Sequence, residues 1–398
     1  MTKGIADILN PDTDWHERIE KFLVTYQSLY NLPQIKNREE ILPSFFNYCL
    51  RGKYFVVIAL YNKERSFFIQ RDFLKRDDHW ELVGGWVQKG ETFDHALDRI
   101  VQKETENIVV EAVPIALVKN HFSTAGGKEL THSGLAFLGR LRYDNIDSQK
   151  GVFTRDGNLS LNERDAKILE LAKKLLTQKV IEPPLEEVDS DTHLGLVRYF
   201  HRYFIKPLFY YGSSKILQNA ILRNAVSVDG AAVKTIVNVA CGDDETILRL
   251  TRNAKLVVAN DISRYSMRDL IEKSDRENII FTNQNLLELA FKKMFDAVIC
   301  KNVMHHMKNT DEIELMLEVL KNLGKRIIIM DIENPRKTFL ARLWNNYYVK
   351  ILKDHGGFFI DFSQFKKIME LYYHQARHIQ CSTIRTIKGV YMLAVIDQ

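Results

Sequence analysis

The sequence is poor in the features that mark secreted, membrane-spanning and zinc-binding proteins. Its four cysteines are widely spaced and form no CxxC pair, which argues against a zinc site and for a reducing compartment. No charged-then-apolar leader opens the chain, and no apolar run reaches the roughly 18 residues that a membrane span needs. The net charge is only +5, with both signs interspersed, so no nucleic-acid partner is required. We therefore expect a soluble protein of the cytoplasm.

Length and composition indicate two globular domains. The chain has 398 residues, of which 45% are hydrophobic and 27% charged, and it is long for a single domain. Between the two halves lies the stretch "IEPPLEEVDSD", residues 181–191, which combines a proline pair with acidic and serine residues. Such a composition is typical of a linker. We predict a first domain over residues 1–180 and a second over residues 192–398.

The first domain is predicted to be α+β. Residues 1 to about 50 have the pattern of helices, and four apolar runs of strand length follow between residues 53 and 143. One clear helix interrupts these runs, in the stretch "ELVGGWVQKGETFDHALDRIVQKETENI", residues 81–108. A glycine pair at the end of an apolar run, followed by a glutamate and a charged helix, is typical of a site that holds a metal against a diphosphate.

The spacing within this stretch resembles the Nudix signature. That signature places a glycine, then a glutamate, and then an arginine, an aliphatic residue and another glutamate on the following helix. In this sequence the corresponding positions hold Gly85, Glu91, Arg99, Val101 and Glu104. The resemblance implies a Nudix-like fold for the first domain.

Three positions depart from the signature. Ile100 and Lys103 stand where the family has glutamates, and Glu106 replaces the closing glycine. Divalent metals on diphosphates need hard oxygen ligands, and two or three carboxylates normally share this task. Lys103 also brings a cation within about one helical turn of Arg99, which opposes metal binding by repulsion. An ordinary pyrophosphatase is therefore disfavoured.

The stretch is also similar to the GDP-mannose mannosyl hydrolases, a Nudix branch that lacks the same two glutamates and holds one metal. The similarity implies that Arg71 grips a diphosphate and that His121 lies near the departing nucleotide, as a substrate-binding and catalytic candidate. It implies that the Gly85 carbonyl and Glu104 contact Mg²⁺, with Glu104 as a further catalytic candidate. Arg99 is an additional candidate for substrate binding.

Two features of that branch are missing. Val56 replaces the aspartate that faces the sugar, and the late glutamine–histidine pair has no counterpart in residues 150–166. We therefore expect the first domain to bind a nucleoside diphosphate derivative and to hydrolyse it slowly or not at all. His95 and His132 are interpreted as surface or packing residues.

The second domain is predicted to be α/β, because five buried-type strands alternate with helical segments. The first strand, in "TIVNVACGDDE", leads into a turn at Gly242, and a later strand ends at Asp261. A glycine turn without a side chain lets a cofactor approach the backbone at the sheet edge. An acidic residue about 20 positions later can accept hydrogen bonds from two ribose hydroxyls. Dinucleotides and S-adenosylmethionine both fit. Because Asp243, Asp244 and Glu245 would repel a pyrophosphate but not a sulfonium, the methyl donor is favoured.

Residues from about 195 to 398 resemble a class I S-adenosylmethionine-dependent methyltransferase of the small-molecule type. The resemblance implies a Rossmann-like, mostly parallel, seven-stranded sheet closed by an antiparallel hairpin around residues 388–389. Asn238 and Ala240 replace the family's usual acid and glycine, so the first motif is degenerate. The implied cofactor-binding residues lie at the ends of successive strands: Asn238, Ala240, Gly242, Asp261, Ile262, Asn285, Leu286 and Lys301.

A histidine pair after the fourth strand is a candidate for acid–base chemistry. Histidine can deprotonate a hydroxyl acceptor near neutral pH, and His305 is the stronger candidate than His306. In the family such a pair usually packs a helix, which is the alternative role. Two aromatic and basic segments, residues 198–217 and 334–359, are interpreted as candidate covers of an acceptor pocket.

Together these motifs predict a methyltransferase that acts on a small-molecule acceptor, with a nucleotide-activated sugar or related metabolite favoured. Two alternatives stay open. One is a nucleic-acid modifier whose Nudix-like domain senses a 5′ end, and the other is a scaffold in which both sites are inactive.

Overall fold

The computed structural model divides the chain into two compact units, Met1–Glu182 and Pro183–Gln398. Each unit is described by itself. The predicted linker, residues 181–191, lies outside the described part of the chain. The described residues are 11–41, 43–50, 52–71, 79–144, 146, 150–155, 160–178, 204–205, 211–225, 227–228, 231–274, 278–289, 291, 294–337, 339–350 and 356–398.

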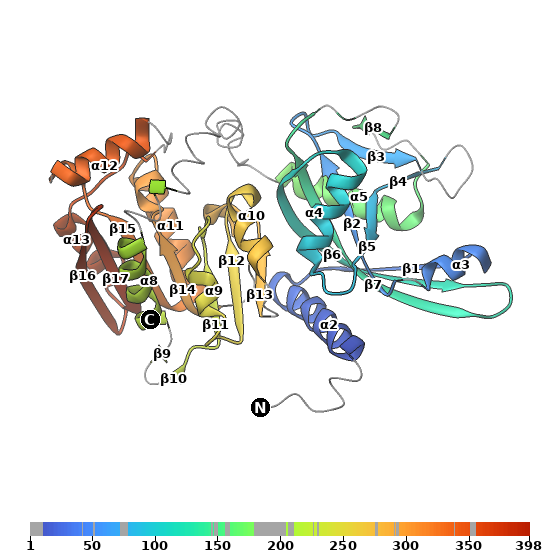
Figure 1. Ribbon diagram of the computed structural model, residues 1–398, viewed down its shortest axis with the longest axis horizontal. Helices are drawn as coiled ribbons and strands as arrows, with labels where there is room; N and C mark the ends of the chain where they lie inside the picture. Colours follow the sequence, from blue (N-terminus) through green and yellow to red (C-terminus); the bar gives the residue numbers. More distant parts are fainter. Residues whose placement is uncertain are drawn as a thin grey trace. The chain divides into compact units, whose positions relative to one another are not determined.

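The first unit is built on one mixed sheet (Figure 1) with the strand order β1-β6-β7-β2-β3-β4, in which β5 also pairs with β2 and β8 with β3. The long β6–β7 pair is antiparallel, whereas β2 runs parallel to β7. The strands are β1 Gln34–Glu40, β2 Tyr54–Tyr61, β3 Phe67–Arg71, β4 Trp80–Glu81, β5 Val83–Trp86, β6 Val109–Ser123, β7 Glu129–Leu141 and β8 Gly151–Thr154.

Helices pack on this sheet through apolar stripes. Helix α5 covers one face, where Ile168, Leu169 and Ala172 join the core formed by Phe55 and Val57 of β2. Helix α4 packs on β2 and β5, and Thr92 caps its first turn by accepting from His95 N at 3.3 Å. The helices are α2 Pro11–Tyr30, α3 Pro43–Cys49, α4 Phe93–Thr105 and α5 Glu163–Gln178.

The prediction of helix throughout residues 1 to about 50 was wrong for β1. This strand, "QIKNREE", pairs in parallel with β6 at the edge of the sheet. Only Ile35 and Asn37 of β1 are buried, while the charged residues Lys36, Arg38 and Glu40 are exposed. Because so few apolar residues are needed at a polar edge strand, the alternation was too weak to recognise.

The second unit contains a sheet with the order β13-β12-β11-β14-β15-β17-β16. Strands β11 to β15 are parallel, whereas β17 is antiparallel to both β15 and β16. The described strands are β9 Ser227–Val228, β10 Ala231–Ala232, β11 Thr235–Asn238, β12 Leu256–Asn260, β13 Ile279–Thr282, β14 Phe295–Lys301, β15 Gly324–Ile332, β16 His378–Thr386 and β17 Gly389–Asp397.

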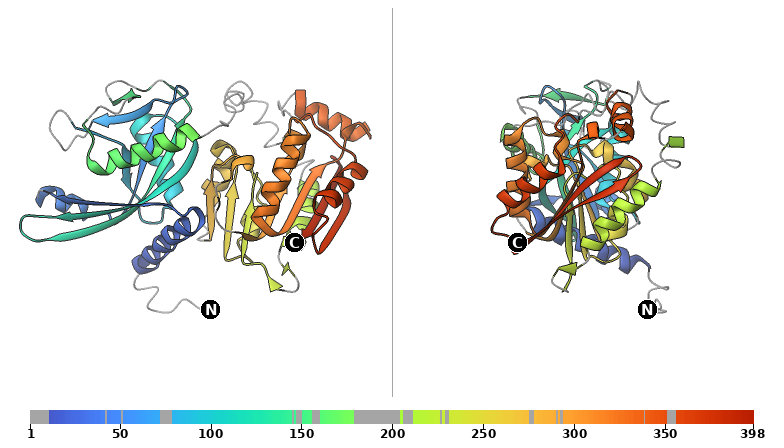
Figure 2. Two further views of the ribbon diagram at one scale, coloured as in Figure 1. Left: turned by 180° about the vertical axis from the view of Figure 1, so that it is seen from behind. Right: turned by 90° about the vertical axis from the view of Figure 1, so that its left-hand side faces the viewer.

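Helices cover both faces of this sheet (Figure 2), which explains why its parallel strands are continuous apolar runs. One core cluster joins Ile221 of α8, Ile247 of α9 and Met267 of α10 to β11, β12 and β14. Helices α11 and α13 pack on β14 to β17. The helices are α8 Tyr211–Ala225, α9 Thr246–Leu250, α10 Arg264–Lys273, α11 Thr310–Leu323, α12 Phe339–Lys350 and α13 Phe362–Tyr372, with 3₁₀ turns η2 Leu286–Glu288, η3 Met304–His306 and η4 Pro335–Lys337.

The closing hairpin of this sheet agrees with the sequence prediction. The antiparallel hairpin lies where it was predicted, with Thr386 opposite Gly389 at its turn. The φ of Gly389 is +138°, a conformation that favours glycine. Within the described residues, no helix combines the length and the apolar character that crossing a membrane requires.

Separate apolar cores predict independent folding of the two units. We expect a fragment that begins at Pro183 to unfold cooperatively, because its core cluster contains no residue of the first unit. Calorimetry of the full chain should then show two transitions, one of which matches the isolated fragment. An unfolded or insoluble fragment would contradict the prediction.

Candidate functional sites

The first site lies at the carboxyl end of β11, where the chain turns at residues 239–242. Gly242 has a φ of +49°, and a Cβ built there would meet no atom within 4 Å. Asn238, at the end of β11, is 1% exposed, and its Oδ1 has no hydrogen-bond partner. A buried acceptor without a partner beside an open backbone turn indicates that a ligand or water completes the site.

The carboxylate of Asp261 lies directly on this turn. Its Oδ2 accepts from Gly242 N at 2.8 Å, and its Oδ1 accepts from Ser263 N at 3.0 Å. A carboxylate has lone pairs for further donors, so these bonds orient the group and still allow it to accept from ribose hydroxyls. The residues around Asn238, Gly242 and Asp261 therefore fit the adenosyl part of S-adenosylmethionine.

A partly buried ion pair lies beside the turn and was not predicted. Lys301, at the end of β14, donates to Asp244 Oδ2 at 2.6 Å, and Thr246 donates to Asp244 Oδ1 through its backbone and its hydroxyl. Burial alone would raise the pKa of Asp244, but the bonds from Lys301 and Thr246 outweigh burial and lower the pKa. Asp244 was interpreted only as a charge that repels phosphate, whereas it also positions Lys301.

The remaining cofactor candidates lie on neighbouring loops. Asn285 Oδ1 accepts from Leu287 N at 3.0 Å and so caps η2, and Leu286 is buried at the start of that turn. Ala240 and Ile262 are partly exposed; Ile262 follows Asp261 directly, and Ala240 lies two residues before Gly242. Contacts of these residues with an adenine ring stay predictions.

The candidate base His305 is held by a carboxylate that sequence analysis missed. Nδ1 of His305 lies 2.6 Å from Asp331 Oδ1, and His305 N donates to Asp331 Oδ2 at 3.3 Å. Asp331 is 2% exposed and is the second-to-last residue of β15, at the carboxyl end of the strand. Because an ionised carboxylate only accepts, the Nδ1 of His305 carries the proton, and Nε2 is the nitrogen that can take one up.

The ring of His305 is also fixed by aromatic neighbours. It stacks on Phe359 with centroids 5.6 Å apart and an interplanar angle of 11°, and it lies 4.2 Å from the ring of His306. The backbone N–H groups of Gly357 and Phe358 both donate to His305 O, at 2.9 and 3.0 Å. The predicted cover segment 334–359 therefore reaches His305 through its last residues.

In the first unit, the glutamate and arginine of the signature bind each other. Arg99 donates to both carboxylate oxygens of Glu91, at 2.5 and 2.8 Å, and to Trp86 O at 2.8 Å. Gln88 N also donates to Glu91 at 2.8 Å. Burial would raise the pKa of Glu91, but the Arg99 and Gln88 bonds outweigh it and lower the pKa. Both residues thus hold the loop onto α4, which leaves Arg99 poorly placed as a substrate ligand.

The predicted metal position lacks ligands. A Cβ at Gly85 would lie 3.0 Å from Ile100 Cδ1, so the isoleucine packs where the family has a carboxylate. Glu104 forms an ion pair with Lys103 at 2.6 Å. Among the described residues, no three His, Cys, Asp or Glu side chains could hold a metal ion together. The residues present therefore do not fit a resident Mg²⁺, since Gly85 and Glu104 alone are too few ligands.

Other parts of the signature keep their structural roles. Glu106, in place of the closing glycine, still takes a left-handed φ of 52° at the end of α4 and pairs with Lys150 at 2.6 Å.

His132 is fully buried against Trp86 and Phe122, and burial lowers its pKa to about 4. His132 is therefore a neutral packing residue, as predicted.

The structure does not bring Arg71 and His121 together. Arg71 ends β3 opposite Trp80, whereas His121 lies on β6, where its Nδ1 is 3.0 Å from the Thr131 hydroxyl. Strands β7 and β2 lie between β6 and β3, so the two positions are three strand spacings apart, about 14 Å across the sheet. That both residues contact one nucleoside diphosphate derivative stays a prediction.

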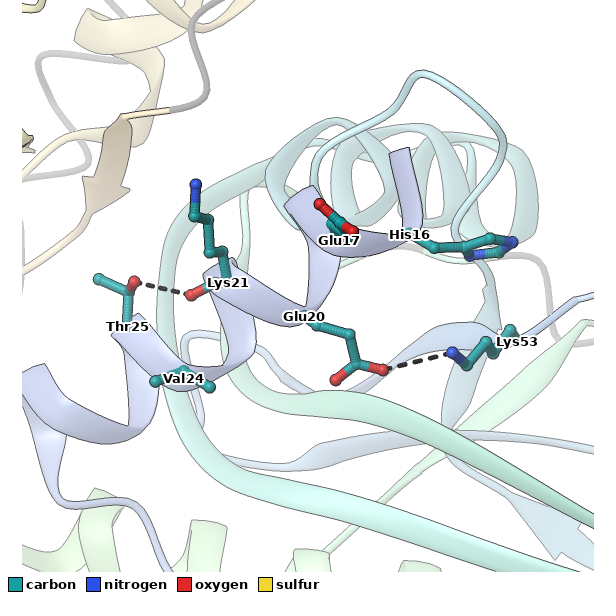
Figure 3. Close-up of a pocket in the computed structure, with 7 residues that line it drawn as sticks. All are labelled: His16, Glu17, Glu20, Lys21, Val24, Thr25 and Lys53. Carbon is teal, nitrogen blue, oxygen red and sulfur yellow. Dashed lines mark hydrogen bonds and ion pairs between the residues drawn. The ribbon is translucent and has the colours of Figure 1, made fainter. Parts of the chain in front are cut away.

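None of these residues lines the shallow pocket of the first unit (Figure 3). It is formed on α2 together with Lys53, and Glu20 within it pairs with Lys53 at 3.5 Å. Opposite charges compensate each other there, and no predicted site residue takes part. The lining consists of His16, Glu17, Glu20, Lys21, Val24, Thr25 and Lys53.

Comparison with known families assigns both units. Residues 51–147 match the NUDIX domain, and residues 237–334 match a methyltransferase domain. The chain joins a NUDIX domain to a methyltransferase domain. The matches confirm the predicted fusion, with S-adenosylmethionine as the cofactor of the methyltransferase domain.

Individual relatives match only part of the chain. The ubiquinone/menaquinone biosynthesis C-methyltransferase UbiE of Geotalea daltonii is 26% identical over 206 residues, which are 52% of this chain and 80% of the relative. The solved magnesium protoporphyrin IX methyltransferase of Synechocystis, with bound SAH, has 17% identity and a TM-score of 0.41, covering 53% of this chain and 97% of that one. The N-methyltransferase NodS of Bradyrhizobium japonicum has 9% identity and a TM-score of 0.38, covering 48% and 98%.

The position of Asp261 predicts its contribution to cofactor binding. Hydrogen bonds to a charged group contribute about 1.5–3 kcal/mol, so Asp261→Ala should weaken S-adenosylmethionine binding roughly tenfold or more. Calorimetric titration of the full chain with S-adenosylmethionine would measure this change in affinity. Asp311→Ala is the control, because Asp311 is exposed on α11. Equal affinity in the Asp261 variant and the parent would exclude the residue from the site.

Proposed function

We propose that the chain methylates a small-molecule acceptor, with His305 as the base that removes the acceptor's proton. The observation that carries this proposal is the 2.6 Å bond from His305 Nδ1 to the buried carboxylate of Asp331. Such a bond fixes the tautomer and stabilises the imidazolium that forms when Nε2 takes up a proton.

Methyl transfer makes modest demands on the protein. S-adenosylmethionine, when bound, supplies the methyl group on an already activated sulfonium. The chain's own residues then orient the acceptor, exclude water and accept one proton. Oxygen, nitrogen and acidic carbon acceptors all lose a proton in such a reaction, and the UbiE relative is named as a C-methyltransferase. The role of His305 is therefore the same for each acceptor class.

For the NUDIX domain we propose binding of a nucleoside diphosphate derivative without ordinary hydrolysis. Three contacts support this: Ile100 packs on Gly85, Glu104 pairs with Lys103, and Glu91 is bonded by Arg99. Charge-assisted bonds to phosphate need no metal, and Arg71 lies next to β4, close to the strand that carries Gly85. The acceptor that would give both domains a role in one reaction is a nucleotide-activated sugar bound by the NUDIX domain. The four cysteines are free thiols, which is consistent with the reducing cytoplasm as the proposed location.

The methylation proposal predicts label transfer. The full chain, incubated with methyl-labelled S-adenosylmethionine and a panel of nucleotide sugars, should yield a labelled product that mass spectrometry detects. His305→Asn should slow this transfer by about 10²-fold or more while cofactor affinity stays the same. His306→Asn is the matched control. Equal rates for His305→Asn and the parent would remove the histidine from the chemistry.

The NUDIX proposal predicts binding without turnover. With Mg²⁺ and the same panel, release of free sugar or phosphate should stay far below about 1 s⁻¹, an ordinary enzymatic rate. Calorimetry should show nucleotide-sugar binding that Arg71→Ala abolishes, because its guanidinium is the proposed partner of the diphosphate. Fast hydrolysis that Glu104→Gln stops would show instead that the signature is catalytically active.

A further inference from the structure

Helix α12 of the methyltransferase domain exposes an apolar stripe. The exposed fractions of Phe339, Leu340 and Leu343 are 78%, 52% and 56%. Phe339 and Leu343 are one helical turn apart on the same face, and Leu340 flanks them. Ile387, in the β16–β17 turn, is 51% exposed. This turn is close to the helix, because a Cβ at Gly389 would lie 3.1 Å from Ala341 Cβ.

The stripe is not explained by packing within the domain. Helix α12 packs mainly on η4 and β17 and buries Ala341 on that side (Figure 1). Three large apolar side chains on one exposed face of a twelve-residue helix differ from the scattered apolar residues of an ordinary surface. A contiguous exposed stripe indicates a surface that is covered by a partner.

The charges around the stripe are positive. The sequence of α12, "FLARLWNNYYVK", contains no acidic residue. Arg336 and Arg342 are exposed at its margin, where Arg342 donates to Arg336 O at 3.0 Å. Among the described residues, the acidic residues nearest to α12 in sequence are Glu333 and Asp361, and both are paired with Lys337, at 2.7 and 3.3 Å. The two arginines therefore give the apolar stripe a positive margin.

We propose that α12 docks on the surface of a lipid bilayer that contains anionic headgroups. A short helix with an apolar face, aromatic residues and flanking cations inserts its apolar side at the headgroup boundary, while its cations attract anionic lipid. Trp344 and Tyr347 supply the aromatic residues. A second copy of the chain is a poorer occupant, because a two-fold contact through this stripe would bring the same arginines together.

Docking through α12 would also place the methylation site at the lipid surface. The chain enters the helix from β15, which carries Asp331, and returns through Gly357 and Phe358, which donate to His305 O. Helix α12 is thus connected at both ends to the edge of the sheet that holds His305. The docking inference itself stands on surface residues and does not depend on the proposed reaction.

Vesicle sedimentation of the full chain tests the proposal. The chain should bind vesicles of phosphatidylcholine with phosphatidylglycerol, more weakly at high salt, and bind pure phosphatidylcholine less well. Phe339→Asn with Leu343→Asn should weaken binding about tenfold or more, because the inserted apolar area is lost. Arg336→Gln with Arg342→Gln should weaken binding only to the anionic vesicles.

The control replaces two exposed leucines elsewhere. Leu315→Asn with Leu371→Asn removes side chains that are 47% and 79% exposed on α11 and α13, and this variant should bind like the parent. Circular dichroism would check that all variants fold. No binding by the parent, or equal binding by the Phe339 and Leu343 variant, would overturn the proposal. The proposal would also be overturned if analytical ultracentrifugation showed that the parent is a dimer, that the Phe339 and Leu343 variant is a monomer, and that neither protein binds vesicles.

Discussion

The buried side chain of Asn260 fixes the sheet edge on which the methyltransferase site depends. Its amide nitrogen donates to the backbone oxygens of Val239 and Gln284, both at 3.0 Å, and its oxygen accepts from Gln284 N at 3.0 Å. A fully buried amide is tolerated only when its hydrogen bonds are made, so the segments that leave β11 and β13 cannot shift past β12. Because Asp261 is the next residue, this network also determines where its carboxylate meets Gly242.

The same principle places the candidate base. Asp331 is buried, and it accepts from the ring and backbone of His305 and from Ile332 N. Burying a carboxylate with fewer hydrogen-bond donors would cost free energy. The hydrogen bonds between His305 and Asp331 therefore fix the positions of both residues. The predicted cofactor turn and the candidate base are therefore both held at strand ends, and the segment that carries α12 lies between β15 and α13 in the chain.

Local sequence signals predicted the parts of the structure that depend on neighbouring residues. The alternation of apolar strands and helices, the hairpin at residues 388–389 and the glycine turn before Asp261 were all legible in this way. Asp331 was not, because it lies 26 positions from His305 and only the parallel pairing of β14 with β15 brings them together. Strand β1 was missed for another reason: it buries only two side chains, so its pattern carried little information.

The NUDIX signature combines a structural role with a ligand-binding role. Its residues have two tasks, to hold the loop on the helix and to hold a metal against a diphosphate. The Glu91–Arg99 pair and the left-handed Glu106 still perform the first task. Ile100 has turned a ligand position into an apolar contact with Gly85, which stabilises the same loop without any ion. The loop geometry of the signature is therefore kept with few metal ligands, which is what the proposed binding without hydrolysis requires.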